Sequence, residues 1–256
     1  MGVLDAIESD YLNGLASLHK YFVLSSYAAT EQHFRPFPLV RTEIEYGFSN
    51  HRAFYDLLQA LVDSIYQRAL IEDGHARRVQ PAKMPDSFGR VLVKPNEALA
   101  SKHHLPAPLI AFYRGREDVF GRLCKIRDNI IHHGHSADFM FTLPDGFALS
   151  LGDTMWADLH ATGIWPTNLM KPNGLVSVLG LLVFLLDDMD KAMAELVKGL
   201  TESFTQLPQP IAQGFRVYLR DHLVVHCTHL KEYRDQHWLD PAAVLQRCRE
   251  KWATKQ

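Results

Sequence analysis

Cysteine is scarce in this sequence: Cys124, Cys227 and Cys248 are the only three among 256 residues. Their number is odd and none of them forms a CxxC pair, which argues against a disulfide framework and against a zinc knuckle. We therefore expect reduced thiols and a cytoplasmic location.

An excess of positive charge is also missing. Lys and Arg together number 27 and Asp and Glu 29, so the formal net charge at pH 7 is −2. A chain with this balance lacks the overall positive field of a protein that binds nucleic acid or acidic membranes nonspecifically. A basic patch of limited extent remains compatible with the composition.

The sequence contains no hydrophobic run long enough to span a membrane. The most apolar stretch, residues 175–186, is interrupted by Ser177 and Gly180 and falls short of the ~20 apolar residues that a spanning helix needs. The first ten residues carry acidic side chains where a secretory signal has a basic flank. We expect a soluble chain with no export signal and no membrane partner.

Several sequence motifs of well-known enzyme classes are absent. Neither GxGxxG nor GxxxxGK[ST] occurs, so the nucleotide-binding folds that cradle phosphates lack support. A GxSxG elbow is also missing, which removes the main indication of a serine hydrolase. We expect no cofactor.

What the sequence does contain is long helical periodicity. Apolar residues recur at three- and four-residue spacing over about 4–33, 39–70 and 109–133, and the apolar stretch 174–200 predicts another long helix. Further helices are expected over 96–103, 153–162, 210–234 and 241–252. The many prolines and glycines between residues 73 and 108 otherwise predict a long irregular connection.

Strand-forming residues stand on both sides of a turn near residues 139–151. Residues 139–143 and 147–151 flank Pro144, Asp145 and Gly146, which is the best hairpin signal in the chain. No internal repeat or linker divides the sequence. We predict an all-α fold, a multi-helix bundle with a small β-hairpin insertion, formed as a single helical domain over residues 1–256.

Polar side chains gather at the end of the predicted helix 109–133. Arg127, Asp128, Asn129 and the pair His132 and His133 occupy its last turns. RNA cleavage without a metal needs a base for the ribose 2′-OH proton and a cation for the phosphate, and His132 and Arg127 are of these types. Asp128, four residues before His132, could accept a hydrogen bond from the imidazole and select its tautomer.

The same residues have a structural interpretation of similar weight, because histidines in a last helical turn bind free carbonyls and complement the helix dipole. On an ideal helix, five residues separate two side chains by about 140° and ~7.5 Å of rise. Arg127 and His132 therefore meet at one phosphate only if a turn deforms or a second chain contributes. A homodimer is the expected assembly.

Arg127, four intervening residues and His132, with polar Asp128 directly after the arginine, resemble the Arg-x4-6-His motif of the HEPN family. The resemblance covers residues 1–135, where a helical pair precedes the motif helix. It implies a helical bundle that acts as a metal-independent endoribonuclease of the toxin, defence or RNA-processing type, or an inactive relative that binds protein or RNA. It also implies Arg127 and His132 as the catalytic pair, Asp128 or Asn129 as a polar aid, and RNA or an antitoxin protein as partner.

Other cations of the motif helix could hold the substrate. We expect Arg122, Lys125 and His133 to contact RNA, as part of a phosphate track along this helix. Acidic residues are interspersed with these cations, so a solvated helix face with local ion pairs is the alternative interpretation.

A second group of histidines lies near the C-terminus. His222, His226 and His229 are spaced i, i+4 and i+7 on a predicted helix, which could bind zinc with a carboxylate. No HExxH motif accompanies them, the residues between them are those of a packed helix, and His103-His104 is equally unspecific. We expect no metal site. The leading hypothesis is the ribonuclease, with a catalytically inactive HEPN-like binding module as its rival.

Overall fold

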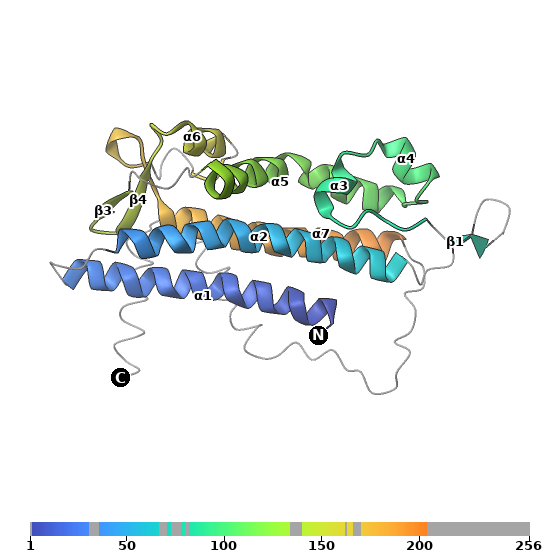
Figure 1. The fold of residues 1–256 in the computed structure, drawn as a ribbon, viewed down its shortest axis with the longest axis horizontal. Coiled ribbons are helices and arrows are strands. Elements are labelled where there is room, and N and C mark those ends of the chain that lie inside the picture. The colour runs from blue at the N-terminus through green and yellow to red at the C-terminus, as the bar shows by residue number, and fades with distance from the viewer. Residues whose placement is uncertain are drawn as a thin grey trace. The chain divides into compact units, whose positions relative to one another are not determined.

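The computed structural model describes residues 2–30, 36–66, 71–72, 78–79, 82–133, 140–161, 163–165 and 170–203. Within these residues lie seven α-helices, a 3-10 turn and five short strands (Figure 1). The expected all-α class with a small β element is confirmed. The helices expected over 210–234 and 241–252, with the three C-terminal histidines, lie outside the described residues.

Four long helices form most of the structure. They are α1 (Val3–Thr30), α2 (Phe37–Tyr66), α5 (Ala107–His133) and α7 (Val178–Ser203). The apolar spacing predicts all four, because each helix buries one stripe of side chains against its neighbours. None of the helices in the described residues combines the length and the apolar content needed to cross a membrane.

Three short helices complete the helical part: α3 (Phe88–Leu92), α4 (Asn96–Ser101) and α6 (Thr154–His160). The sequence predicts α4 and α6, and the carboxylate of Asp153 caps α6 by accepting the backbone N–H of Met155 at 2.8 Å. The sequence does not predict α3, because a helix of five residues among prolines is too short to show a period. Its three apolar residues are all buried, so tertiary packing stabilises it.

The predicted hairpin is confirmed. Strands β3 (Met140–Leu143) and β4 (Gly146–Ser150) pair antiparallel, with Leu143 opposite Gly146. Gly146 has a φ of +125°, and a Cβ atom at this position would collide with the hydroxyl of Tyr21. Only glycine therefore fits at the start of β4. A separate antiparallel pair of two-residue strands, β1 (Ile71–Glu72) and β2 (Arg78–Val79), lies between α2 and α3 in the chain.

A third strand joins the hairpin where the sequence predicts helix. Residues Leu175–Ser177 form β5, which pairs antiparallel with β4 and places Val176 opposite Leu149. The expectation of a helix from residue 174 is therefore wrong for its first four residues, and α7 begins at Val178. The cause is the free edge of β4, a tertiary partner that the local apolar period cannot reveal.

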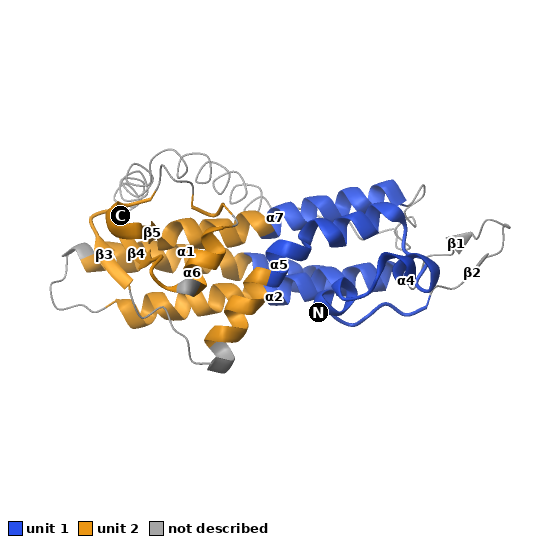
Figure 2. Ribbon diagram, turned by 90° about the horizontal axis from the view of Figure 1, so that it is seen from above, with its two compact units in different colours: residues 1–11, 52–121, 189–217 blue, residues 12–51, 122–188, 218–256 orange. Residues whose placement is uncertain are grey.

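The chain divides into two compact units (Figure 2). Unit 1 comprises residues 1–11, 52–121 and 189–217, and unit 2 comprises residues 12–51, 122–188 and 218–256. Within the described ranges, every boundary between the units falls inside one of the four long helices. This explains why no linker marks the division in the sequence.

The core of unit 1 is an aromatic cluster centred on Phe88 of α3. Its ring lies 4.8 Å from that of Tyr55, 5.1 Å from that of Tyr113 and 5.0 Å from that of Phe120, between ring centroids. Phe112 adds an edge-to-face contact at 5.9 Å. Aromatic pairs at these separations each contribute about 0.5–1.5 kcal/mol beyond burial, so the cluster fastens α3 to α2 and α5.

In unit 2 the helices α1, α2 and α7 approach closely at glycines. A Cβ at Gly14 would meet the side chains of Leu186 and Asn50, and one at Gly47 would lie 3.1 Å from Leu185. Small residues at these positions leave room for the leucines of α7. Most of α7 in this unit is buried, which agrees with its apolar sequence.

Candidate functional site

The helix that carries the Arg127–His132 motif, α5, continues without a break to His133. Leu123, Ile126 and Ile130 form its buried stripe in this region. At about 100° per residue, the helical positions of Asp128 and His132 fall some 150–170° from the centre of that stripe. The positions of Asp128 and His132 therefore lie on the side of α5 that is directed away from its buried residues, whereas the position of Arg127 lies about 70° from the centre of the stripe.

Arg127 forms an ion pair with its neighbour in sequence. Its Nη1 donates to Oδ1 of Asp128 at 2.8 Å, and the two side chains are 28% and 47% exposed. The helical position of Asp128 lies between those of Arg127 and His132, about 40° from the latter. The ion pair thus draws the guanidinium around the helix toward the side of His132.

The guanidinium of Arg127 keeps unused donors. Its Nε is buried and has no hydrogen-bond partner among the described residues. A planar guanidinium presents five N–H donors, so the contact with Asp128 leaves capacity for a phosphate.

Four residues of α5 form a polar stripe, which we define as Lys125, Asp128, Asn129 and His132. Their spacing of i, i+3, i+4 and i+7 puts these positions on one face of the helix. Lys125 is 69% exposed, and Asn129 is half-buried. The structure thus brings together on one face the positions of four of the residues that the sequence predicts to act on RNA.

Two of the predicted substrate-binding cations contact α6. Lys125 Nζ lies 3.3 Å from Oδ2 of Asp158, and Arg122 Nη1 donates to the backbone carbonyl of Asp158 at 3.3 Å. The side chain of Asp158 is 61% exposed. Ion pairs this exposed are worth about 0–1 kcal/mol, so Lys125 can exchange Asp158 for a phosphate at little cost.

The imidazole rings of His132 and His133 lie outside the described part of the structure. Their backbone belongs to α5, and no deformed turn separates His132 from Arg127. Arg127 and His132 were expected to meet at one phosphate only if a turn deforms or a second chain contributes. The helix shows no deformed turn between them. A second chain is therefore needed to bring the two side chains to the same phosphate.

A buried histidine–aspartate pair is not predicted from the sequence. His51 Nε2 of α2 donates to Oδ2 of Asp188 of α7 at 2.8 Å, and the side chains are only 2% and 5% exposed. One feature of the sequence could have indicated it: two acids, Asp187 and Asp188, directly follow the apolar run 181–186. Carboxylates that are buried with such a run need a polar partner. Its burial keeps the pair from any substrate, and it links α2 to α7 in unit 2.

Unit 1 has a pocket of its own between residues 83 and 103, with a volume of about 440 Å³. His103, one of two adjacent histidines to which the sequence assigns no role, lines it together with several lysines. The sequence could not predict this pocket, because one of the two short helices that form it, α3, is too short to show a helical period.

Within the described ranges, no group of three His, Cys, Asp or Glu side chains is arranged to hold a metal ion. The three histidines of residues 222–229 lie outside those ranges. In comparisons with protein-family models, with curated protein sequences and with solved structures, nothing matches this chain.

Proposed function

We propose that this chain is a HEPN-like, metal-independent endoribonuclease, with His132 and Arg127 as its catalytic pair. The observation that carries the proposal is the ion pair of Arg127 with Asp128 beside the polar stripe of α5. It supplies a partly exposed cation, held toward the side of the helix on which His132 is located. A histidine and an arginine are the two groups that this reaction requires.

In the proposed reaction the ribose 2′-oxygen attacks the adjacent phosphorus while His132 takes the 2′-OH proton. The bond to the 5′-oxygen breaks, and that oxygen receives a proton from a protonated imidazole or from water. Arg127 stabilises the negative charge that grows on the phosphate. The products are a 2′,3′-cyclic phosphate and a 5′-OH end, and water is not the nucleophile.

We infer that the site is completed by a second copy of the chain. The unbroken helix keeps the Arg127 and His132 positions about 140° apart, so one helix does not direct both side chains at the same phosphate. A two-fold axis beside α5 would place Arg127 of one copy near His132 of the other. Light scattering at micromolar concentration should report a dimer, and a monomer would contradict the composite site.

Asp128 acts in this proposal as a positioning residue for Arg127. Replacing Asp128 by Asn removes the charge that holds the guanidinium while keeping the size of the side chain. We expect about a tenfold loss of kcat, which corresponds to ~1.4 kcal/mol. Arg127→Ala should cost more, and Arg127→Lys should recover only part of the loss because lysine lacks the planar fork.

The experiment that tests the activity is incubation of the purified chain with mixed RNA in EDTA, followed by analysis of product ends. We expect cleavage to cyclic phosphate ends with a bell-shaped pH profile. His132→Ala should lose about 10²–10⁴-fold in rate, the usual worth of general acid–base catalysis. His19→Ala is the matched control, because His19 is an exposed histidine on α1 of the same unit.

The rival function is an inactive HEPN-like module that binds RNA or protein. The ion pair of Arg127 with Asp128 favours it, because the carboxylate offsets the charge of the expected catalytic cation, whereas Lys125 stays largely exposed. RNA that is bound but uncut by the wild-type chain would select this alternative. Equal cleavage by wild type and His132→Ala would also reject the ribonuclease mechanism.

A further inference from the structure

The pocket of unit 1 is an open one, lined by one continuous stretch of chain. Residues 82–87 lead into α3, the chain turns at residues 93–95 into α4, and it returns at Lys102 and His103. A volume of about 440 Å³ lies within the range of small-molecule sites.

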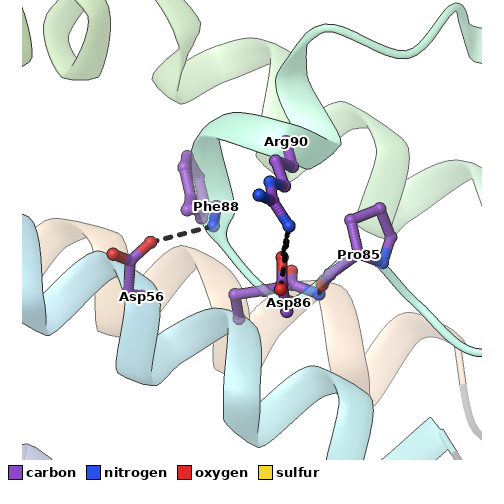
Figure 3. Close-up of polar contacts among 6 residues, drawn as sticks. Asp56, Pro85, Asp86, Phe88 and Arg90 are labelled. Carbon is purple, nitrogen blue, oxygen red and sulfur yellow. Dashed lines mark hydrogen bonds and ion pairs between the residues drawn. The ribbon is translucent and has the colours of Figure 1, made fainter.

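Positive charge dominates the lining of this pocket. The charged side chains are Lys83, Lys94, Lys102 and Arg90, opposed by the single carboxylate of Asp86. Arg90 Nη1 binds both oxygens of Asp86, at 2.7 and 2.9 Å, and Figure 3 shows its side chain extending from α3 toward that carboxylate. Within the described part of the chain, no ion pair involves the three lysines. The lining therefore carries three positive charges that no described carboxylate compensates.

His103 adds a polar atom that lacks a partner. Only 4% of this residue is exposed, and its Nδ1 donates to the carbonyl of Ala82 at 3.4 Å. Its Nε2 is buried without a hydrogen-bond partner among the described residues. With a proton on Nδ1, Nε2 accepts from a hydroxyl of a hydrogen phosphate, or donates to a phosphate oxygen once the ring is charged.

The turn between α3 and α4 is held by Arg114 of α5. Its guanidinium donates to the carbonyl of Leu92 at 2.7 Å, to the carbonyl of Lys94 and to Oδ1 of Asn96 at 2.7 Å. A cation at the last carbonyls of α3 also complements the dipole of that helix. The position of Lys94 in the lining is thus fixed through its own backbone.

Helix α2 fixes the opposite end of the segment. Gln59 Nε2 donates to the carbonyl of Pro85 at 2.8 Å. The N–H of Phe88 donates to Oδ1 of Asp56 at 3.0 Å (Figure 3). The backbone that carries Lys83 and Asp86 is therefore bound to a regular helix on its inner side. Groups positioned in advance lose less entropy when a ligand binds.

We propose that this pocket is a binding site for the phosphate group of a small ligand. Lys83, Lys94 and Lys102 neutralise the oxyanion, and His103 Nε2 makes the buried hydrogen bond. A phosphate suits the site because it carries more than one negative charge and offers both acceptor oxygens and a hydroxyl. The proposal is independent of ribonuclease activity, since it rests on residues of unit 1 only.

Isothermal titration calorimetry of the full chain with inorganic pyrophosphate and with ATP tests the proposal and separates two sources of the phosphate. Binding of both indicates a site for phosphate itself, and binding of ATP alone indicates a nucleotide. Either result supports the proposal, provided that Lys83→Gln/Lys102→Gln weakens binding about tenfold or more, as loss of two charge-assisted contacts implies.

The matched control is Lys191→Gln/Lys198→Gln, which changes the net charge equally by replacing two exposed lysines of α7 in the same unit. This variant should bind as wild type does. Asp86→Asn should bind more tightly, because it removes the one carboxylate of the lining. In ¹⁵N-histidine spectra, the Nε2 signal of His103 should move when pyrophosphate is added.

The proposal is overturned if neither ligand binds at millimolar concentration. It is also overturned if the two lysine double variants lose affinity equally, since the attraction would then be a property of the whole surface. A shift of the His103 signal that persists unchanged in Lys83→Gln/Lys102→Gln would show that the ligand does not use these lysines.

Discussion

Polar side chains hold different kinds of element in place in the two units. In unit 1, Arg114, Gln59 and Asp56 bind backbone atoms of the segment around α3 and α4. In unit 2 a deeply buried polar contact joins two side chains, His51 and Asp188, from two regular helices. Irregular backbone leaves N–H and C=O groups that need partners, whereas long helices satisfy their own.

The difference extends to the two candidate sites. The pocket of unit 1 is lined by a segment whose backbone is bound from both α2 and α5, so the backbone positions of its lining residues are set before a ligand arrives. The motif of unit 2 lies on the partly exposed side of α5, and Asp128 is the described residue that holds Arg127. We therefore expect the pocket to bind as a finished site and the motif to depend on a second chain.

The largest expected effect on stability is in unit 2. Replacing His51 by Ala leaves the carboxylate of Asp188 buried without this partner, and breaking a buried pair in this way typically costs about 3–5 kcal/mol. Urea unfolding of the variant measures the loss, with His19→Ala as the exposed control. A change below about 1 kcal/mol would contradict the structural role of the pair.

An alkaline pH dependence follows from Tyr21, whose hydroxyl accepts the N–H of Phe147 at 3.1 Å in unit 2. Burial raises the pKa of Tyr21 to about 12 from the ordinary value of 10.0. The folded state keeps this proton while the unfolded state loses it, so stability falls as the pH rises from about 10 to 12. The contribution is about 2–3 kcal/mol at ~1.4 kcal/mol per pKa unit.

The variant Tyr21→Phe should lose that part of the pH dependence, as measured by unfolding at pH 9 and pH 11.5. Burial also raises the pKa of Tyr66 and of Tyr113 in unit 1, so a smaller slope should remain. Tyr66→Phe, which removes one of these two groups, is the corresponding test in unit 1. An identical slope in wild type and Tyr21→Phe would contradict the prediction.

A smaller effect is expected from Arg114→Ala in unit 1. Loss of hydrogen bonds from a charged group to two carbonyls and an amide should cost about 2 kcal/mol. Hydrogen exchange of the amides in residues 88–101 should accelerate before that of α2. Arg90→Ala is the control, because its ion pair with Asp86 is 70% and 64% exposed and should be worth less than about 1 kcal/mol.

The smallest effect is expected from the exposed pair of Lys198 and Glu202 on α7, where Nζ and Oε1 are 3.8 Å apart. Lys198→Ala should change the free energy of unfolding by no more than about 0.5 kcal/mol, as for other i,i+4 pairs on helices. Thermal unfolding at low and at high salt measures it. A loss of stability as large as that of Arg114→Ala would contradict the prediction that an exposed lysine contributes less than an arginine that binds backbone carbonyls.

Local patterns sufficed for the regular part of this protein. Apolar residues every three or four positions predicted the four long helices, since a buried stripe on a helix repeats at that period. The turn at Asp145 and Gly146 predicted the hairpin, and Gly146 proved to be the residue that the approach of Tyr21 requires. The motif at the end of α5 was located from residue types alone.

The elements that the sequence missed depend on distant partners. Helix α3 is too short to persist without the aromatic cluster around Phe88, and β5 exists because β4 has a free edge. The division into two units is invisible in the sequence because its boundaries in the described chain fall within helices. Each of these features arises from contacts between segments far apart in the chain.

The sequence by itself thus determined which segments are helical, where the hairpin turns, and that Arg127 and His132 occupy the end of one helix. The tertiary structure decided which polar groups meet. His51 finds Asp188 across 137 positions, and Arg114 reaches the carbonyls of a turn some 20 residues earlier. The physical reason is that periodicity depends on neighbours along the chain, whereas a hydrogen bond or an ion pair forms only where folding brings its two ends within about 3 Å.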